Sequence, residues 1–210
     1  MRQIKNVSGV LSGRFVPQRN GSESLLFFSV AAQERVPSRE IEELIVELSS
    51  GNTEALERLY VKTKSAVYGF ALSILKNTHQ AEDVLQDTYL KILASADSYT
   101  PKGKPMAWIM TVTKNLALMK IRENSRFADM PEHEEQAVES HEIYFENKSV
   151  LNAAMNVLSS EESAIVVMHA VSGMKHREIA EVTGLSLSTV LSKYNRALKK
   201  MKAELEGVMP

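Results

Sequence analysis

The residues best suited to chemistry lie between Glu178 and Lys202, near the C-terminus. Two helical patterns meet there at Gly184, a residue type that can end a helix in the left-handed conformation. This arrangement predicts a helix-turn-helix unit, in which the second helix enters the major groove of DNA. We therefore predict an interface with duplex DNA. The alternative is a helical scaffold whose charges form a solvated face.

The second helix of this unit carries cations and has no acid between Glu181 and Glu204. The early residues of such a helix contact base edges, while cations along its flanks neutralise phosphates. The predicted base-reading residues are Thr189, Ser192 and Lys193. The predicted phosphate-binding residues are Arg177, Arg196 and Lys199.

A second, weaker basic pattern lies mid-chain, on a helix that carries Lys114, Asn115, Lys120, Arg122 and Arg126. An asparagine amide can donate one hydrogen bond and accept another at the same base edge, which makes Asn115 a candidate base-reading residue. The alternative is an amide that faces solvent. The loop before this helix contains Tyr99, Lys102 and Lys104. An aromatic ring in a flexible loop can hold a base that has left the stack. Trp108, in contrast, is expected in the core.

An acidic and amide-bearing face is predicted on the helix before that loop. Its members fall out of phase with the apolar residues of their helix, and they are Glu82, Asp83, Gln86 and Asp87. Such a face can dock a protein partner. It can equally complement the dipole near the start of the helix.

Catalysis, cofactor binding and membrane insertion find little support in the 210 residues. The chain has no cysteine, and its five histidines never show the HExxH spacing of a zinc site. His133 beside Glu134 and Glu135 could recruit a metal, but a solvated acidic segment is the favoured interpretation. The sequence has no glycine-rich phosphate loop and no apolar run of about 18 residues. Because the formal net charge is −1, only the distribution of charge can indicate a nucleic-acid partner.

Hydrophobic periodicity predicts an all-α protein with two small helical domains. The first domain is expected over residues 38–125, and the second, which contains the helix-turn-helix, over residues 147–206. Residues 126–146 hold seven acids against one base, which predicts a flexible acidic linker. Residues 1–37 lack a helical period and are expected to form a disordered extension rather than a targeting signal.

Local signals place the helices within the first domain. A helix from Ser38 is expected to bury Ile41, Leu44, Ile45 and Leu48. Asn77 and Thr78 end a second, long helix and cap a third, which buries Ala81, Val84, Leu85, Thr88 and Ile92. A fourth helix is expected from Pro105 to about Arg122, marked by Trp108, Val112, Leu116 and Met119.

Similar signals place the helices of the second domain. Ser159 and Glu162 match a capping box, and the helix they open is expected to stop at Gly173. A short helix is expected over residues 176–183. Ser186 then caps a last helix, expected over residues 187–205.

Taken in order, these segments resemble a bacterial RNA polymerase sigma factor of the sigma-70 family, extracytoplasmic-function (ECF) group, over residues 40–205. Three motifs carry the resemblance: GNTEALERLY at 51–60 with AEDVLQDT at 81–88, PMAWI at 105–109 with KNLA at 114–117, and REIA at 177–180 with GLS at 184–186 and TV at 189–190. The order and spacing of the motifs, together with the acidic linker, make the resemblance specific.

The resemblance implies a cytoplasmic sigma factor that binds core RNA polymerase and directs initiation at promoters, without catalysis or a cofactor. By position, the polymerase β′ clamp helices would contact Glu82, Asp83, Gln86 and Asp87. The −10 element would contact Tyr99, Lys102, Lys104, Lys114, Asn115 and Arg122. The −35 element would contact Arg177, Thr189, Ser192, Lys193, Arg196 and Lys199, with the β flap as a further partner of the second domain. The family often also has an anti-sigma factor that covers these surfaces.

The sequence departs from the family pattern at a few positions. Ser188 and Leu191 stand where glycine and a basic residue are frequent, Met119 where aspartate is common, and Lys175 in place of a serine cap. These departures bear on the promoter sequence and on DNA affinity. Two other interpretations stay open: a stand-alone helix-turn-helix regulator, which predicts tight DNA binding without polymerase, and a helical metal-dependent hydrolase.

Overall fold

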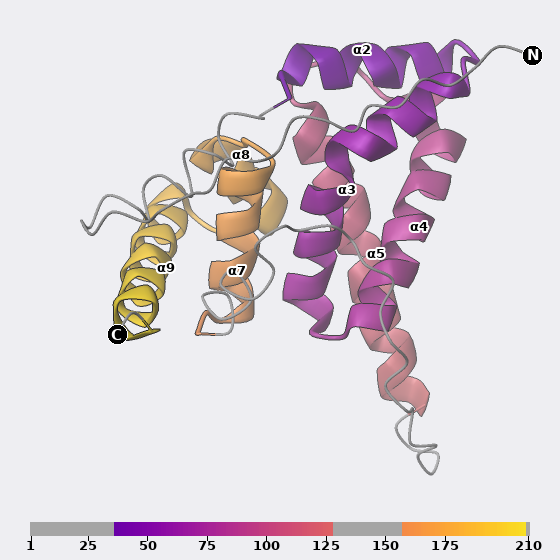
Figure 1. Cartoon of the computed structure of the whole chain (residues 1–210). Helices are drawn as coiled ribbons and strands as arrows, with labels where there is room; N and C mark the ends of the chain where they lie inside the picture. The colour runs from indigo at the N-terminus through magenta and orange to yellow at the C-terminus, as the bar shows by residue number, and fades with distance from the viewer. Residues whose placement is uncertain (1–35, 128–156, 209–210) are drawn as a thin grey trace, which may run out of the picture.

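Four α-helices form the N-terminal half of the described chain. The structure is a computed structural model that describes residues 36–127 and 157–208. The four helices are α2 (Ser38–Ser49), α3 (Glu54–Leu75), α4 (Thr78–Ser95) and α5 (Pro105–Phe127), with a 3-10 turn η1 (Ala96–Ser98) after α4. Helices α3, α4 and α5 form a bundle, and α2 runs across one end of it (Figure 1). Residues 1–35 lie outside the described part.

The remaining elements form a second group beside α3 (Figure 1). They are α7 (Ser160–Val166), the π-helical turn η2 (Val167–Val171), α8 (His176–Thr183) and α9 (Leu187–Val208). All regular elements within the described ranges are helical, which confirms the predicted all-α fold. Nearly all of the predicted acidic linker, and the start of the predicted second domain, lie outside the described residues.

The caps that begin α4 and α7 are those that the sequence predicts. Asn77 accepts a hydrogen bond from the Gln80 amide at 3.0 Å and so satisfies a free donor at the start of α4. Ser159 and Glu162 each accept a hydrogen bond from the other's amide, at 3.3 and 3.0 Å, which completes the capping box.

The apolar stripes of α2 and α4 are also as predicted. Every residue expected to face inward on these two helices is at most 5% exposed: Ile41, Leu44, Ile45, Leu48, Ala81, Val84, Leu85, Thr88 and Ile92. These stripes hold α2 and α4 against α3, so the residues between the stripes are directed outward.

The inward face of α5 differs from the prediction. The buried residues are Met106, Ile109, Met110, Thr113 and Ala117, whereas the predicted Met119 is 51% exposed and Trp108 is only half-buried. Both sets of residues have helical spacing, and packing against α3 and α4 selects the first set. The helix also continues to Phe127, five residues beyond the predicted end.

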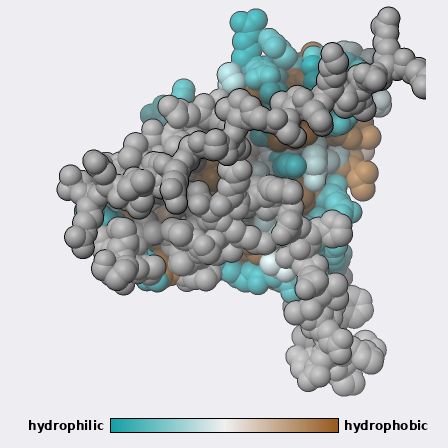
Figure 2. All heavy atoms as spheres, viewed as in Figure 1, coloured by the Kyte–Doolittle hydropathy of each residue, from teal (hydrophilic) through white to brown (hydrophobic). Residues whose placement is uncertain are grey.

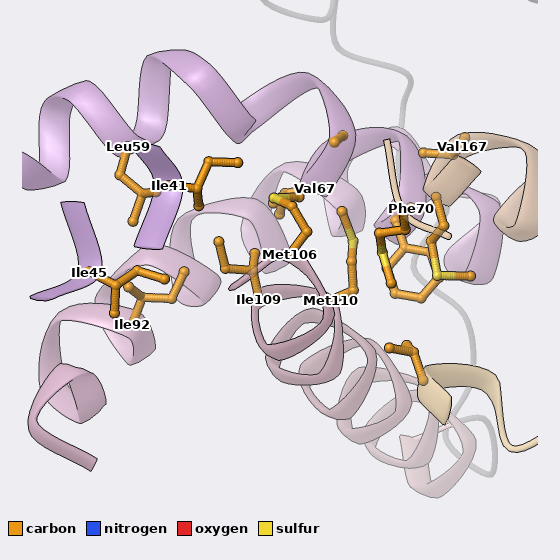
Figure 3. Packing of buried hydrophobic residues seen from close by; sticks show 14 of the residues in the cluster. Ile41, Ile45, Leu59, Val67, Phe70, Ile92, Met106, Ile109, Met110 and Val167 are labelled. Carbon is orange, nitrogen blue, oxygen red and sulfur yellow. The ribbon is translucent and has the colours of Figure 1, made fainter. Parts of the chain in front are cut away.

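The two groups of helices share one continuous core. Phe70 of α3 is 2% exposed and belongs to the same buried cluster as Val167, Met168 and Met174 from the second group. Figure 3 shows Val167 beside Phe70, with Met106, Ile109 and Met110 further along the same layer. The sequence pattern did not predict this contact between the two groups. No helix in the described ranges has the length and hydropathy needed to cross a membrane.

Candidate nucleic-acid interface

Helices α8 and α9 form the helix-turn-helix that the sequence predicts. Gly184 ends α8 with a φ of 79°, and its amide donates to the Ala180 carbonyl at 2.9 Å. Ile179 and Val190 are fully buried between the helices, so the corner has its own apolar support. Ser186 then accepts the Thr189 amide at 3.2 Å and caps α9. This geometry leaves one side of α9 exposed.

Four of the six residues predicted for duplex DNA lie on the exposed surface of this unit: Arg177, Ser192, Arg196 and Lys199. A shallow groove of about 430 Å³ runs along α9 and is lined by Ser188, Thr189, Ser192, Lys193 and Arg196. Hydroxyl groups and a guanidinium in one groove are donors and acceptors suited to base edges and phosphates.

The other two predicted residues have partners within the fold. Lys193 Nζ lies 2.6 Å from a carboxylate oxygen of Glu161 on α7. Thr189 Oγ1 lies 2.8 Å from the Ser186 hydroxyl. Each side chain would therefore exchange an internal partner for a nucleic-acid partner on binding, which lowers the net gain from that contact.

The basic residues predicted on and before α5 also fall into an exposed set and a set with partners inside the fold. Lys102, Asn115 and Arg122 are exposed. Lys104 Nζ lies 2.9 Å from both carboxylate oxygens of Glu181, and Lys114 Nζ donates to the Val182 carbonyl at 2.8 Å. Both partners belong to α8, so two of the predicted DNA contacts are occupied by the helix-turn-helix unit.

The loop before α5 is held by a glutamate on α2. The Tyr99 hydroxyl and the Gly103 amide donate to the same Glu42 oxygen, at 2.8 and 2.9 Å. Burial, together with the Glu42 carboxylate, raises the pKa of the Tyr99 phenol. The Tyr99 ring also packs on Trp108 at a centroid distance of 5.0 Å. Glu42, which no sequence pattern indicated, fixes a loop that was expected to be flexible.

The acidic face predicted on α4 is present, with Asp83, Gln86 and Asp87 exposed and Glu82 half-buried. Lys120 of α5 lies 3.0 Å from Asp83, and this hydrogen bond raises the pKa of the Lys120 ammonium. Leu90 continues the face one turn further and is 64% exposed, with Leu93 at 40%. Figure 2 shows hydrophobic side chains along the outer edge of α4. These two leucines were not predicted from the sequence.

A cluster of three rings, from η2, α8 and α9, was also not predicted from the sequence. His169 and His176 stack at a centroid distance of 4.2 Å, and Tyr194 meets both rings edge-on. His176 Nε2 is buried without a hydrogen-bond partner. Burial, followed by the nearby His169, lowers the pKa of His176. In the described ranges no three His, Asp or Glu residues group as metal ligands do, and His133 lies outside those ranges.

Comparison with known proteins identifies the family to which the chain belongs. The family model for Sigma-70 region 2 matches residues 59–127, and the model for Sigma-70 region 4 matches residues 149–201. The ECF RNA polymerase sigma factor SigK of Mycobacterium sp. (strain KMS) is 25% identical over 173 residues, covering 78% of this chain and 89% of that protein. EcfG of Rhodopseudomonas palustris (strain TIE-1), also an ECF sigma factor, is 26% identical over 159 residues, covering 73% and 86%.

Solved structures show the same fold. The sigma factor RpoE of Bartonella quintana, in complex with the anti-sigma factor NepR, matches with a TM-score of 0.57 at 24% identity, covering 73% of this chain and 98% of that one. CnrH, in complex with the cytosolic domain of CnrY, matches with a TM-score of 0.54 at 22% identity, covering 80% and 99%. On the two family models and the curated relatives, the chain belongs to the sigma-70 family of RNA polymerase sigma factors, in the ECF group. It is a factor that directs transcription initiation.

Proposed function

We propose that three surfaces of this chain divide the work of a sigma factor. The α4 surface, made of Glu82, Asp83, Gln86 and Asp87 with Leu90, binds the β′ clamp helices of core RNA polymerase. The acidic groups orient the partner and speed association, and the exposed leucine adds apolar area to be buried at the centre of the contact.

The second surface binds the −10 element. It comprises Tyr99, Lys102, Lys104, Lys114, Asn115 and Arg122, on the loop before α5 and on α5 itself. These side chains offer cations for the backbone and an amide for a base edge. The ordering of the loop by Glu42 supports a preformed site, which lowers the entropy cost of binding.

The third surface binds the −35 element as duplex DNA. Arg177, Thr189, Ser192, Lys193, Arg196 and Lys199 lie on α8 and α9, and the same unit meets the β flap of the polymerase. The observation that carries the proposal is the helix-turn-helix with an exposed row of Ser192, Arg196 and Lys199. The domains proposed to hold these surfaces are residues 38–125 and 147–206, joined by the acidic segment 126–146.

The protein would act by binding, in the cytoplasm where the polymerase transcribes, without chemistry of its own. An anti-sigma partner is part of the proposal, because the fold matches that of RpoE in its complex with NepR.

Charge reversal on α4 tests the polymerase surface. Asp87 is exposed, so Asp87→Lys should leave stability within about 0.5 kcal/mol of the wild type while weakening retention of core polymerase on the tagged protein. Glu43→Lys on α2 is the matched control, since Glu43 is also exposed and makes the same change of charge. Equal retention by wild type and Asp87→Lys would remove the α4 surface from the proposal.

A further inference from the structure

The stretch between η1 and α5 is attached at two points to one carboxylate oxygen. The Tyr99 hydroxyl donates to Glu42 Oε1 at 2.8 Å, and the Gly103 amide donates to the same atom at 2.9 Å. Glu42 lies on α2, 57 residues before Tyr99 and 61 residues before Gly103. One side chain that is distant in sequence therefore holds both the first residue and a late residue of this loop.

Each attachment has support of its own. The Tyr99 ring packs on Trp108, in the first turn of α5, at a centroid distance of 5.0 Å. Burial, followed by the Glu42 carboxylate, raises the pKa of the Tyr99 phenol, so its hydroxyl remains a donor at neutral pH. Gly103 has a φ of 68°, which a residue with a Cβ rarely adopts, although a Cβ there would meet no atom within 4 Å. Glycine thus serves the backbone conformation that directs this amide to Glu42.

The helix that carries Glu42 is itself fixed. Ile41 is 3% exposed and Ile45 is fully buried, so α2 is held against the bundle on both sides of Glu42. A group that positions another is effective when its own backbone is fixed in this way. Glu42 is half-buried and so has the loop on one side and solvent on the other.

The hydrogen bonds of Glu42 are directed to the loop alone. Among the described residues, its side chain bonds Tyr99 and Gly103 and forms no ion pair. The neighbouring loop residues Lys102 and Lys104 are cations that the proposed function assigns to −10 DNA. A carboxylate beside such cations opposes the approach of phosphates. Its presence there is explained if it orders the loop instead of contacting DNA.

We propose that Glu42 is a positioning residue of the −10 surface, which acts through the Tyr99 hydroxyl and the Gly103 amide and thereby determines how strictly the loop selects bases. With Glu42 in place the loop is ordered before DNA binds, so little entropy is lost on binding. Without Glu42 the loop adapts to several sequences, and the penalty against a wrong base falls. This inference rests on the proposed −10 surface and adds a residue of α2 to it.

Run-off transcription by the reconstituted holoenzyme, on fragmented DNA from the genome that encodes this chain, tests the inference. Glu42→Ala should lower the yield from the promoters used by wild type about tenfold, the scale of one to two lost hydrogen bonds to a charged group. Glu43→Ala is the matched control, because Glu43 is the next residue of α2 and carries the same charge. Its partner is Arg39 in the same helix, at 2.8 Å, and not the loop.

Three further readouts separate positioning from a loss of stability. Retention of core polymerase and affinity for −35 duplex should each stay within about twofold of wild type, as for an ordinary surface change. The start sites that Glu42→Ala uses should share a less restricted −10 sequence and an unchanged −35 sequence. A parallel fall in polymerase retention, −35 affinity and transcript would show a purely structural role and would overturn the inference.

The conservative variant and the loop residues test the route through which Glu42 acts. Glu42→Gln keeps a carbonyl oxygen with two lone pairs for the two donors, so its yield should be within about threefold of wild type. Gly103→Ala and Tyr99→Phe each remove one attachment and should relax the −10 sequence in the same direction as Glu42→Ala. Adding Tyr99→Phe to Glu42→Ala should cause no further loss, because the hydroxyl has already lost its acceptor.

The contradicting results are distinct from a failure of the proposed function. If Glu42→Ala matches Glu43→Ala in yield and in −10 sequence, or if Glu42→Gln is as defective as Glu42→Ala, the positioning role is wrong. Additive losses from Glu42→Ala and Tyr99→Phe would also contradict it. If the wild-type protein gives no polymerase-dependent start site, the proposed function itself fails.

Discussion

Two neighbouring lysines on α9 show how position decides the role of a residue. Lys200 Nζ lies 2.7 Å from a Glu162 oxygen, and that carboxylate is 3% exposed. Burial alone would raise the pKa of Glu162, but the hydrogen bonds from Lys200 and Ser159 outweigh it and the pKa is lowered. Lys199 instead points to solvent on the surface proposed for DNA. One lysine stabilises the fold, and the other is available to a ligand.

Substitution by methionine should separate these roles. Lys200→Met leaves a buried carboxylate with one partner fewer, and we expect the free energy of unfolding to fall by about 1–2 kcal/mol. Lys199→Met should change the free energy of unfolding by less than about 0.5 kcal/mol. Its affinity for −35 duplex should fall less steeply with salt, with the magnitude of the log–log slope smaller by about 0.9. Urea unfolding and salt titrations measure the two effects. The same stability loss in both variants would contradict the assignment.

The stacked histidines give the C-terminal unit a dependence on pH. The pKa of His176 is lowered in the folded state, so the unfolded chain binds the proton more readily. The stabilisation from neutral His176 is complete above the unfolded pKa of about 6.5 and is lost as pH falls below it.

Thermal unfolding between pH 7.5 and 5.5 tests this dependence. The melting temperature of wild type should fall as pH falls, and His176→Phe should show a smaller fall because no buried ring takes up a proton. His79→Gln, at an exposed position on α4, is the control and should retain the wild-type slope. An unchanged slope in His176→Phe would show that another group carries the effect.

At the scale of single elements, the turn between α8 and α9 depends on the backbone of Gly184. Its φ of 79° is strained for a residue with a Cβ, although a Cβ there would meet no atom within 4 Å. We expect Gly184→Ala to lower the free energy of unfolding by about 1 kcal/mol and Gly184→Asn by less, because asparagine tolerates this conformation. Denaturant unfolding measures both, and an alanine variant as stable as wild type would contradict the backbone argument.

Sequence reasoning predicted most helices because their signals are local. Asn77, Ser159 and Gly184 act within a few residues, so each cap could be identified from its neighbours. The inward face of α5 could not, since Met110 and Met119 are alike in type and only their partners on other helices distinguish them. The α4 surface was predicted from acidic and amide residues that fall out of phase with the apolar ones. The α9 surface was predicted from the turn at Gly184 and from a following helix that carries cations without acids.

At the scale of the whole molecule, the contact between the two groups of helices was beyond sequence reasoning. Periodicity shows which residues of one helix share a face, but it does not show that Phe70 and Val167 are buried in the same cluster. The contacts of Lys104 and Lys114 could not be predicted for the same reason, because they form only once α8 lies beside α5. The roles proposed for individual residues remain predictions.

The measurement that tests the central claim most directly is run-off transcription with purified core polymerase on fragmented DNA from the genome that encodes this chain. With the protein present, defined start sites should appear that core polymerase alone does not give, and their upstream sequences should share two elements at a fixed spacing. No new start site, together with no retention of core polymerase on the protein, would contradict the account and would favour a stand-alone regulator of transcription.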